Sequence, residues 1–294
     1  MRVWVDTDYG FDDLWALLVL RHGGVEVSGI SLVAGNAPLP QVVANARGAT
    51  AHYGFTAPLH AGADRPLQRA PETAQRILGP RGMTSRGGYL PEGDVPLASK
   101  EAVAALAGWL ITAEAPQVLA LGPLTNIARL IQQHPEAAAR IRRLVWMGGS
   151  NGPGNHSAQA EFNALADPEA ADVVARAGLP LDVVDLMACR QARFGPADMP
   201  RCEGLTGDLL GGYLDIGLSR GRDGMAIYDP VAALALTRPE ALEFQPRAMH
   251  VSTTPDESYG ATTFDATGQG RTRLATGVAS NAAHLCLDAL RTDD

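Results

Sequence analysis

Short apolar runs alternate with helical patterns over the first two thirds of the chain. The apolar runs predict strands at residues 3–5, 25–36, 58–61, 117–122, 141–149 and 181–186. Apolar residues at helical spacing predict helices at residues 14–20, 41–53, 102–113, 124–133 and 168–177. This alternation, with strands that are apolar throughout, predicts an α/β fold with a mostly parallel central sheet and helices on both faces.

The pattern loosens after Pro239. Residues 247–251 and 260–265 are typical of antiparallel strands, and residues 279–291 predict a closing helix. The chain contains no internal repeat, low-complexity tract or evident linker. We therefore predict one domain that spans residues 1–294.

Composition narrows the class of protein. Of the 294 residues, 46% are hydrophobic and 19% are charged, which is typical of a globular protein with a sizeable core. The net charge of −8 argues against a nucleic-acid partner. The apolar runs are too short to span a membrane and no signal peptide is evident, so we expect a cytoplasmic protein without a membrane partner.

The three cysteines are Cys189, Cys202 and Cys286, and their spacing fits neither a zinc site nor a disulfide framework. We expect them to be buried free thiols.

Polar or glycine residues follow several of the predicted strands. Aspartates follow residues 3–5, Asn36 ends the second strand, and the segments 122–123 and 148–150 follow two later ones. The carboxyl ends of parallel strands share one edge of a sheet, and ligands bind beyond that edge. We therefore predict that the active site lies there.

The stretch VWVDTDYGFDD, residues 3–13, holds four aspartates: Asp6, Asp8, Asp12 and Asp13. Carboxylates this close repel one another unless a cation or shared protons compensate. Asp12 or Asp13 could cap the following helix, but capping does not account for Asp6 and Asp8. The cluster favours a bound hard cation with oxygen ligands.

Two other aspartate-rich patterns fit less well. Counted from Asp6, an EF-hand loop would need glycine at its sixth position and glutamate at its twelfth, where this chain has Phe11 and Leu17. A haloacid-dehalogenase-type phosphatase also begins with a strand and D-x-D, but it needs a basic group for the phosphoryl charge. The only lysine, Lys100, has no suitable context. The phosphatase is the less favoured alternative.

DTDYGFDDLWAL, residues 6–17, resembles the D-x-D-P-G-x-D-D motif of the inosine-uridine-preferring nucleoside hydrolase family. Four further segments resemble family motifs in the family's order: LVAGN (32–36), LGPLTNIA (121–128), MGGSNGPGNHSAQAEFNALADPEAA (147–171) and IYDPVAA (227–233). The resemblance implies a Rossmann-like core and hydrolysis of the N-glycosidic bond of ribonucleosides by a Ca²⁺-activated water. It also implies a role in nucleoside salvage and a homodimer or homotetramer.

The resemblance also implies a role for individual residues. The Ca²⁺ ligands would be Asp8, Asp13, Asp229 and the backbone carbonyl of Leu121, with Asp8 as general base and Asp6 as support behind them. The 2′ and 3′ hydroxyls of ribose would contact Asp12, Asn36 and Asn163. The 5′ hydroxyl would contact Asn155 and Glu161, and the sugar would lie against Met147 and Phe162.

Two residues depart from the family pattern. Tyr9 replaces a proline, and we expect tyrosine to adopt the backbone φ that proline would fix. Tyr228 replaces a histidine that can protonate the leaving base, and tyrosine is a weaker acid near neutral pH. Tyr228 is the candidate partner of the leaving base, and base preference stays open between purine, pyrimidine and modified nucleosides.

Further candidates surround the base. They are Tyr213, Arg222 and Asp223, the edge residue His156, and the loop 79–91, where Arg81 or Arg86 could reach the leaving group or simply lie in solvent. A second hypothesis is a catalytically weak ribose- or nucleoside-binding protein that kept the metal site and lost activation of the leaving base.

Overall fold

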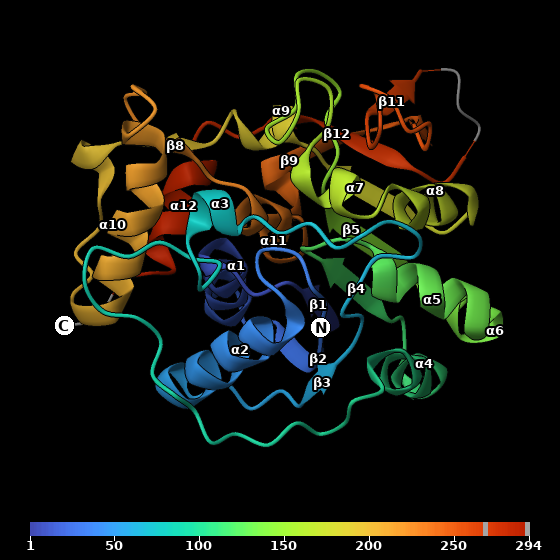
Figure 1. The fold of residues 1–294 in the computed structure, drawn as a ribbon, viewed down its shortest axis with the longest axis horizontal. Helices are drawn as coiled ribbons and strands as arrows, with labels where there is room; N and C mark the ends of the chain where they lie inside the picture. The colour runs from blue at the N-terminus through green and yellow to red at the C-terminus, as the bar shows by residue number, and fades with distance from the viewer. Residues whose placement is uncertain (267–269, 292–294) are drawn as a thin grey trace.

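The computed structural model describes residues 1–266 and 270–291, and an eight-stranded sheet runs through its centre (Figure 1). The strand order is β3-β2-β1-β4-β5-β6-β12-β9, and only the β12–β9 pair is antiparallel. The strands are β1 (Arg2–Thr7), β2 (Glu26–Leu32), β3 (Leu59–Ala61), β4 (Gln117–Ala120), β5 (Arg143–Met147), β6 (Leu181–Val184), β9 (Leu242–Pro246) and β12 (Arg273–Val278).

Helices cover both faces of this sheet. They are α1 (Phe11–His22), α2 (Leu39–Tyr53), α3 (Gln75–Leu78), α4 (Ala102–Thr112), α5 (Thr125–Gln133), α6 (Pro135–Ala138), α7 (Phe162–Ala166), α8 (Pro168–Arg176), α9 (Leu186–Cys189), α10 (Gly204–Leu218), α11 (Asp229–Thr237) and α12 (Ala282–Asp288). Two short antiparallel pairs and two 3₁₀ turns complete the fold: β7 (Arg193–Phe194) with β8 (Met225–Ala226), β10 (Ala248–Val251) with β11 (Thr262–Asp265), η1 (Pro196–Asp198) and η2 (Pro239–Ala241).

Successive side chains of β1 point to opposite faces of the sheet, and the core is divided into one cluster on each face. Val3 and Val5 pack into a cluster that includes α1, α2, α11 and α12, whereas Trp4 packs on the other face with α4, α5 and α8. The predicted α/β fold, with a mostly parallel sheet and helices on both faces, is therefore confirmed. The predicted antiparallel segments after Pro239 pair as β10 and β11. Within the described residues, every helix is too short or too polar to cross a membrane.

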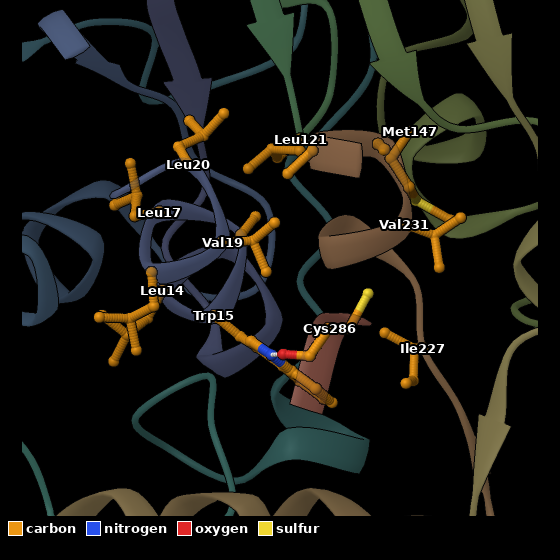
Figure 2. Close-up of a cluster of buried hydrophobic side chains, with 14 of the residues drawn as sticks. Leu14, Trp15, Leu17, Val19, Leu20, Leu121, Met147, Ile227, Val231 and Cys286 are labelled. Atoms are coloured by element: carbon orange, nitrogen blue, oxygen red, sulfur yellow. Dashed lines mark hydrogen bonds between the residues drawn. The ribbon is translucent and has the colours of Figure 1, made fainter. Parts of the chain in front are cut away.

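Helix α1 lies at the centre of the larger cluster (Figure 2). Trp15 is fully buried, and its indole Nε1 donates a hydrogen bond of 2.7 Å to the carbonyl of Cys286 in α12. Val231 of α11 belongs to the same cluster, and α1 packs along α11. Cys189 and Cys286 are buried free thiols as predicted, but Cys202 is only half-buried, because it lies in the irregular segment before α10.

A carboxylate clamp ties strands together at their amino ends, away from the predicted site. Asp182 of β6 is 2% exposed and accepts hydrogen bonds from Arg143 of β5 at 2.7 Å and from Arg273 of β12 at 2.6 and 2.7 Å. Both guanidinium groups also lie over the ring of Phe244 in β9. One buried carboxylate thus holds four neighbouring strands in register.

Replacing Asp182 with alanine should lower the free energy of unfolding by about 2 kcal/mol. Removing one partner of a fully buried pair costs about 3–5 kcal/mol, and partial exposure of the two arginines reduces that figure. Urea unfolding measures the change. Asp172→Ala is the matched control, because its partner Arg176 is 79% exposed and should contribute less than about 0.5 kcal/mol. Equal losses in the two variants would contradict a role for the clamp.

Candidate active site

The carboxyl ends of β1, β2, β4 and β5 border one pocket. Asp8 follows β1, Asn36 follows β2, Leu121 follows β4 and Met147 ends β5. The lining contains every residue that the resemblance assigned to the site except Asp13 and the supporting Asp6, namely Asp8, Asp12, Asn36, Leu121, Met147, Asn155, Glu161, Phe162, Asn163, Tyr228 and Asp229. Asp13 is fully buried directly behind this lining. The sequence therefore identified one contiguous place in the fold.

Packing of α1 against α11 brings distant carboxylates together. Asp12, Asp13 and Asp229 each offer an oxygen within 4.8 Å of the others. Asp13 and Asp229 were predicted metal ligands, whereas Asp12 was predicted to contact ribose. All three lie in the first turn of their helices, where the helix dipole favours negative charge.

Asn36 links Asp8 to this group. The backbone N–H of Asn36 donates to one Asp8 oxygen at 2.7 Å, and its side-chain Nδ2 donates to the other at 2.9 Å. The same Nδ2 lies 3.2 Å from an oxygen of Asp13, which also accepts the backbone N–H of Gly10 at 2.8 Å. The orientation of both carboxylates is thus fixed by amide donors.

The cluster carries more negative charge than its surroundings offset. Burial raises the pKa of Asp8 well above its usual range, and the charge on Asp13 adds to the effect. Burial and the charge on Asp12 do the same to the pKa of Asp229, while burial and Asp13 raise the pKa of Asp12 to about 7. No basic side chain in the described residues forms an ion pair with this cluster. A cluster of carboxylate oxygens without a basic partner suits a bound hard cation, which would supply the missing positive charge.

Polar side chains that hydrogen-bond to backbone groups form the adjoining wall of the pocket. Glu161 is the N-cap of α7 and accepts backbone N–H groups from Asn163 at 2.9 Å, Gly149 at 2.9 Å and Ala164 at 3.0 Å, while burial raises its pKa to about 7. Asn163 donates through Nδ2 to the carbonyl of Leu121 at 2.9 Å. These contacts hold the polar wall rigid before any substrate binds.

Tyr9 differs from the prediction. Its φ is +49°, in the left-handed region that proline cannot adopt, so the expectation that tyrosine takes proline's φ is wrong. The backbone N–H of Tyr9 donates to Thr7 Oγ1 at 3.0 Å, a bond that proline lacks. The ring is fully buried in the core and does not line the pocket. No group in the described part of the chain hydrogen-bonds its hydroxyl.

Replacing Tyr9 with phenylalanine should therefore raise the free energy of unfolding by about 1 kcal/mol and leave activity unchanged, because it removes a buried hydroxyl that lacks a partner. Thermal and urea unfolding measure the change. Tyr53→Phe is the control: its hydroxyl lies 3.0 Å from Thr206 Oγ1, and its loss should destabilise by about 1 kcal/mol. Destabilisation of Tyr9→Phe would show that the hydroxyl has a partner.

Comparison with known proteins identifies the family. The family model for inosine-uridine preferring nucleoside hydrolases matches residues 3–286. The chain belongs to this family. It is 35% identical over 274 residues to the non-specific ribonucleoside hydrolase RihC of Salmonella enteritidis PT4, covering 92% of this chain and 89% of RihC.

Solved nucleoside hydrolases share the fold. The plant nucleoside hydrolase PpNRh1 superposes with a TM-score of 0.91 at 23% identity, over 99% of both chains. A purine-preferring ribonucleoside hydrolase from Gardnerella vaginalis superposes with a TM-score of 0.89 at 23% identity, over 99% of this chain and 98% of that one. The protein is thus a nucleoside hydrolase, an enzyme that hydrolyses N-glycosidic bonds, and the phosphatase alternative is set aside. The family is metal-dependent, and this chain carries the acidic cluster for a metal.

At the other end of this nucleoside hydrolase's pocket, only some of the lining residues were predicted from the sequence. Tyr213 and His156 line it, but Arg222 and Asp223 do not. Asp223 instead pairs with Arg193 at 2.6 Å. The sequence missed six lining residues: Ala74, Ile77, Leu78, Ile216, Arg220 and Met225. They come from α3 and its N-cap, from α10 and the turn after it, and from β8, none of which carries a recognisable motif.

The loop 79–91 is fastened to α10. Arg86 forms a two-pronged pair with Asp215 at 2.7 and 2.9 Å, and the backbone N–H of Gly88 donates to Asp208 at 2.6 Å. Arg81 lies over the ring of Tyr89, 4.6 Å from its centroid. Of the two alternatives for this loop, contact of Arg81 or Arg86 with the leaving base is not supported, because neither side chain lines the pocket and each has a partner elsewhere.

Proposed function

We propose that this nucleoside hydrolase converts ribonucleosides and water to free base and ribose with the help of Ca²⁺. The buried, oxygen-only cluster at one end of the pocket carries the proposal, because it needs a hard cation to offset its charge. The ligands would be Asp8, Asp13, Asp229 and the carbonyl of Leu121. Bound there, the cation offsets the carboxylate charge and makes a neighbouring water a stronger nucleophile.

Asp8 acts as the general base. As the water oxygen bonds to C1′ of ribose, Asp8 takes a proton from the water, and the C1′–N bond breaks with its electron pair leaving on the base. The amide contacts from Asn36 support this role, because they fix the orientation of the Asp8 carboxylate. Negative charge around C1′ also stabilises the ribosyl cation that develops in the transition state.

Ribose is held by hydrogen-bonding groups that line the same wall. Asp12, Asn36 and Asn163 bind the 2′ and 3′ hydroxyls. Asn155 and Glu161 bind the 5′ hydroxyl, and Met147 and Phe162 pack against the sugar. A hydroxyl both donates and accepts, so carboxylates and amides match it, and a sugar that lacks one of these hydroxyls leaves a buried polar group unpaired. The name of the RihC relative supports ribose as the sugar.

Tyr228 acts on the departing base as a hydrogen-bond donor. Burial raises the pKa of its hydroxyl above the usual range, so the proton stays on Tyr228 at neutral pH. Tyr228→Phe should lower kcat for uridine and inosine about tenfold, which is the loss of one transition-state hydrogen bond. It should leave p-nitrophenyl riboside, whose leaving group needs little help, nearly unchanged. Equal losses on both kinds of substrate would contradict this role.

A panel of purine, pyrimidine and modified ribonucleosides, with p-nitrophenyl riboside, tests the function. Free base is followed by chromatography with and without added Ca²⁺. We expect hydrolysis of p-nitrophenyl riboside and of at least one ribonucleoside. The corresponding 2′-deoxynucleosides should be hydrolysed much more slowly. Ribose binding with no hydrolysis of any substrate would favour the ribose-binding alternative. The salvage role, the homodimer or homotetramer and the cytoplasmic location stay predictions.

A further inference from the structure

A second hollow borders the active-site pocket. A second cavity of about 470 Å³ lies between α3 and α10, which Figure 1 shows beside each other. It shares three lining residues with the active-site pocket: Ile77, Ile216 and Arg220. The two hollows are therefore neighbours, and two apolar side chains and one guanidinium group border both of them.

The second cavity is positively charged, in contrast to the ribose end. Arg76 of α3 and Arg220, just after α10, line it, and neither has an ion-pair partner in residues 1–266 and 270–291. Asp215 also lines it, but both Asp215 oxygens already accept from Arg86 at 2.7 and 2.9 Å. Two arginines are left without a counter-charge.

Charge and polarity thus change in order from the first hollow to the second. The ribose end holds the carboxylates of Asp8, Asp12 and Asp229. Ile77 and Ile216 follow, and they suit the faces of a flat ring. Arg220 at the shared border and Arg76 in the second cavity present two guanidinium groups, whose N–H donors match the two oxygens of a carboxylate. A substrate that satisfies all three regions has ribose at one end and a carboxylate at the other, with the base between them.

We propose that Arg76 and Arg220 form a subsite for a carboxylate carried by the departing base, so that the enzyme favours ribonucleosides whose base bears an acidic substituent. This inference rests on the proposed function, because it places the base between the ribose wall and the second cavity. The substituent stays intact throughout the reaction, and its pairing with the arginines positions the base for departure.

A matched pair of substrates tests the subsite. 5-Carboxymethyluridine and its methyl ester differ by one negative charge at nearly equal size. For the unmodified enzyme we expect kcat/KM to be about tenfold higher for the acid than for the ester. Arg76→Gln and Arg220→Gln should each reduce that ratio about threefold to fivefold, and added salt should reduce it as well. Arg65→Gln is the control, because Arg65 is 69% exposed and lines neither cavity.

The outcomes separate the subsite from the proposed function. Hydrolysis of uridine and the ester with no preference for the acid, or an equal acid-to-ester ratio in all variants, overturns the subsite and leaves the function standing. Failure to hydrolyse any nucleoside overturns the function. Calorimetry then decides the subsite without turnover, because 5-carboxymethyluracil should bind more tightly than its methyl ester and lose that advantage in Arg220→Gln. Equal binding of the two bases overturns it.

Discussion

Replacing Asp8 with asparagine should reduce kcat about 10³-fold and leave the enzyme folded. The asparagine cannot take a proton from water, and it also weakens the proposed cation site. The fold should persist because asparagine has nearly the same shape, and because ionised Asp8 is unfavourable among its neighbours, where burial and Asp13 raise its pKa. The rate is measured on p-nitrophenyl riboside and on the best nucleoside of the panel at saturating Ca²⁺.

Two control measurements test whether a loss of activity in Asp8→Asn comes from the loss of the base and not from misfolding. Asp64→Asn removes an exposed carboxylate, 63% accessible, and should have normal activity. The melting temperature of metal-free Asp8→Asn should equal or exceed that of the metal-free parent, because one buried charge has gone. Near-normal hydrolysis by Asp8→Asn would exclude Asp8 as the base.

Removing divalent cations with a chelator should abolish hydrolysis to a similar extent, and Ca²⁺ should restore it. The cluster of half-buried Asp12 and buried Asp13 and Asp229 forms no ion pair with a basic side chain among the described residues. Ca²⁺ at one hundred times its dissociation constant should add about 2.7 kcal/mol to the free energy of unfolding. Activity and melting temperature are measured across a Ca²⁺ titration, with Mg²⁺ in parallel. Full activity after exhaustive chelation would contradict the metal site.

The same cluster sets a pH dependence for the metal-free enzyme. Burial raises the folded-state pKa of Asp12 to about 7 and of Glu161 to about 7, whereas unfolded carboxyls titrate near pH 4. Between these values the folded state binds more protons than the unfolded state, so stability falls as pH rises from about 5 to 8. Ca²⁺ should flatten this slope, because the cation favours ionised carboxylates. A metal-free melting temperature that rises over this pH range would contradict it.

The ribose end of the site was predictable because its residues lie in or just after short, locally coded elements. Strands such as β1 and β4 are evident from their short runs of apolar residues, and the polar residues that follow parallel strands must meet at one edge of the sheet. Asp8 and Asn36 are placed by that rule, whereas Leu121 was assigned only through the family resemblance. Asp229 was found only through its motif, since nothing in the local pattern shows that α11 packs against α1.

The base end was not predictable because tertiary contacts decide it. Helix α10 contains Gly204, Gly207, Gly211, Gly212 and Gly217, a composition that disfavours a helix. At Gly212 the reason lies in the loop that packs on the helix, because a Cβ added there would come within 2.5 Å of the backbone of Thr84 and Ser85. The left-handed φ of Tyr9 likewise depends on its surroundings, since tyrosine alone avoids that conformation.

The packing of α1 against α11 has a consequence for synthesis on the ribosome. Asp8 and Asp13 emerge from the ribosome long before Asp229, which lies in α11. β12 is inserted between β6 and β9, so the central sheet is complete only when residues 273–278 have left the exit tunnel. The proposed cation site cannot form before α11 has been made, and chains that stop before β12 should be inactive. Activity therefore requires synthesis at least as far as residue 278.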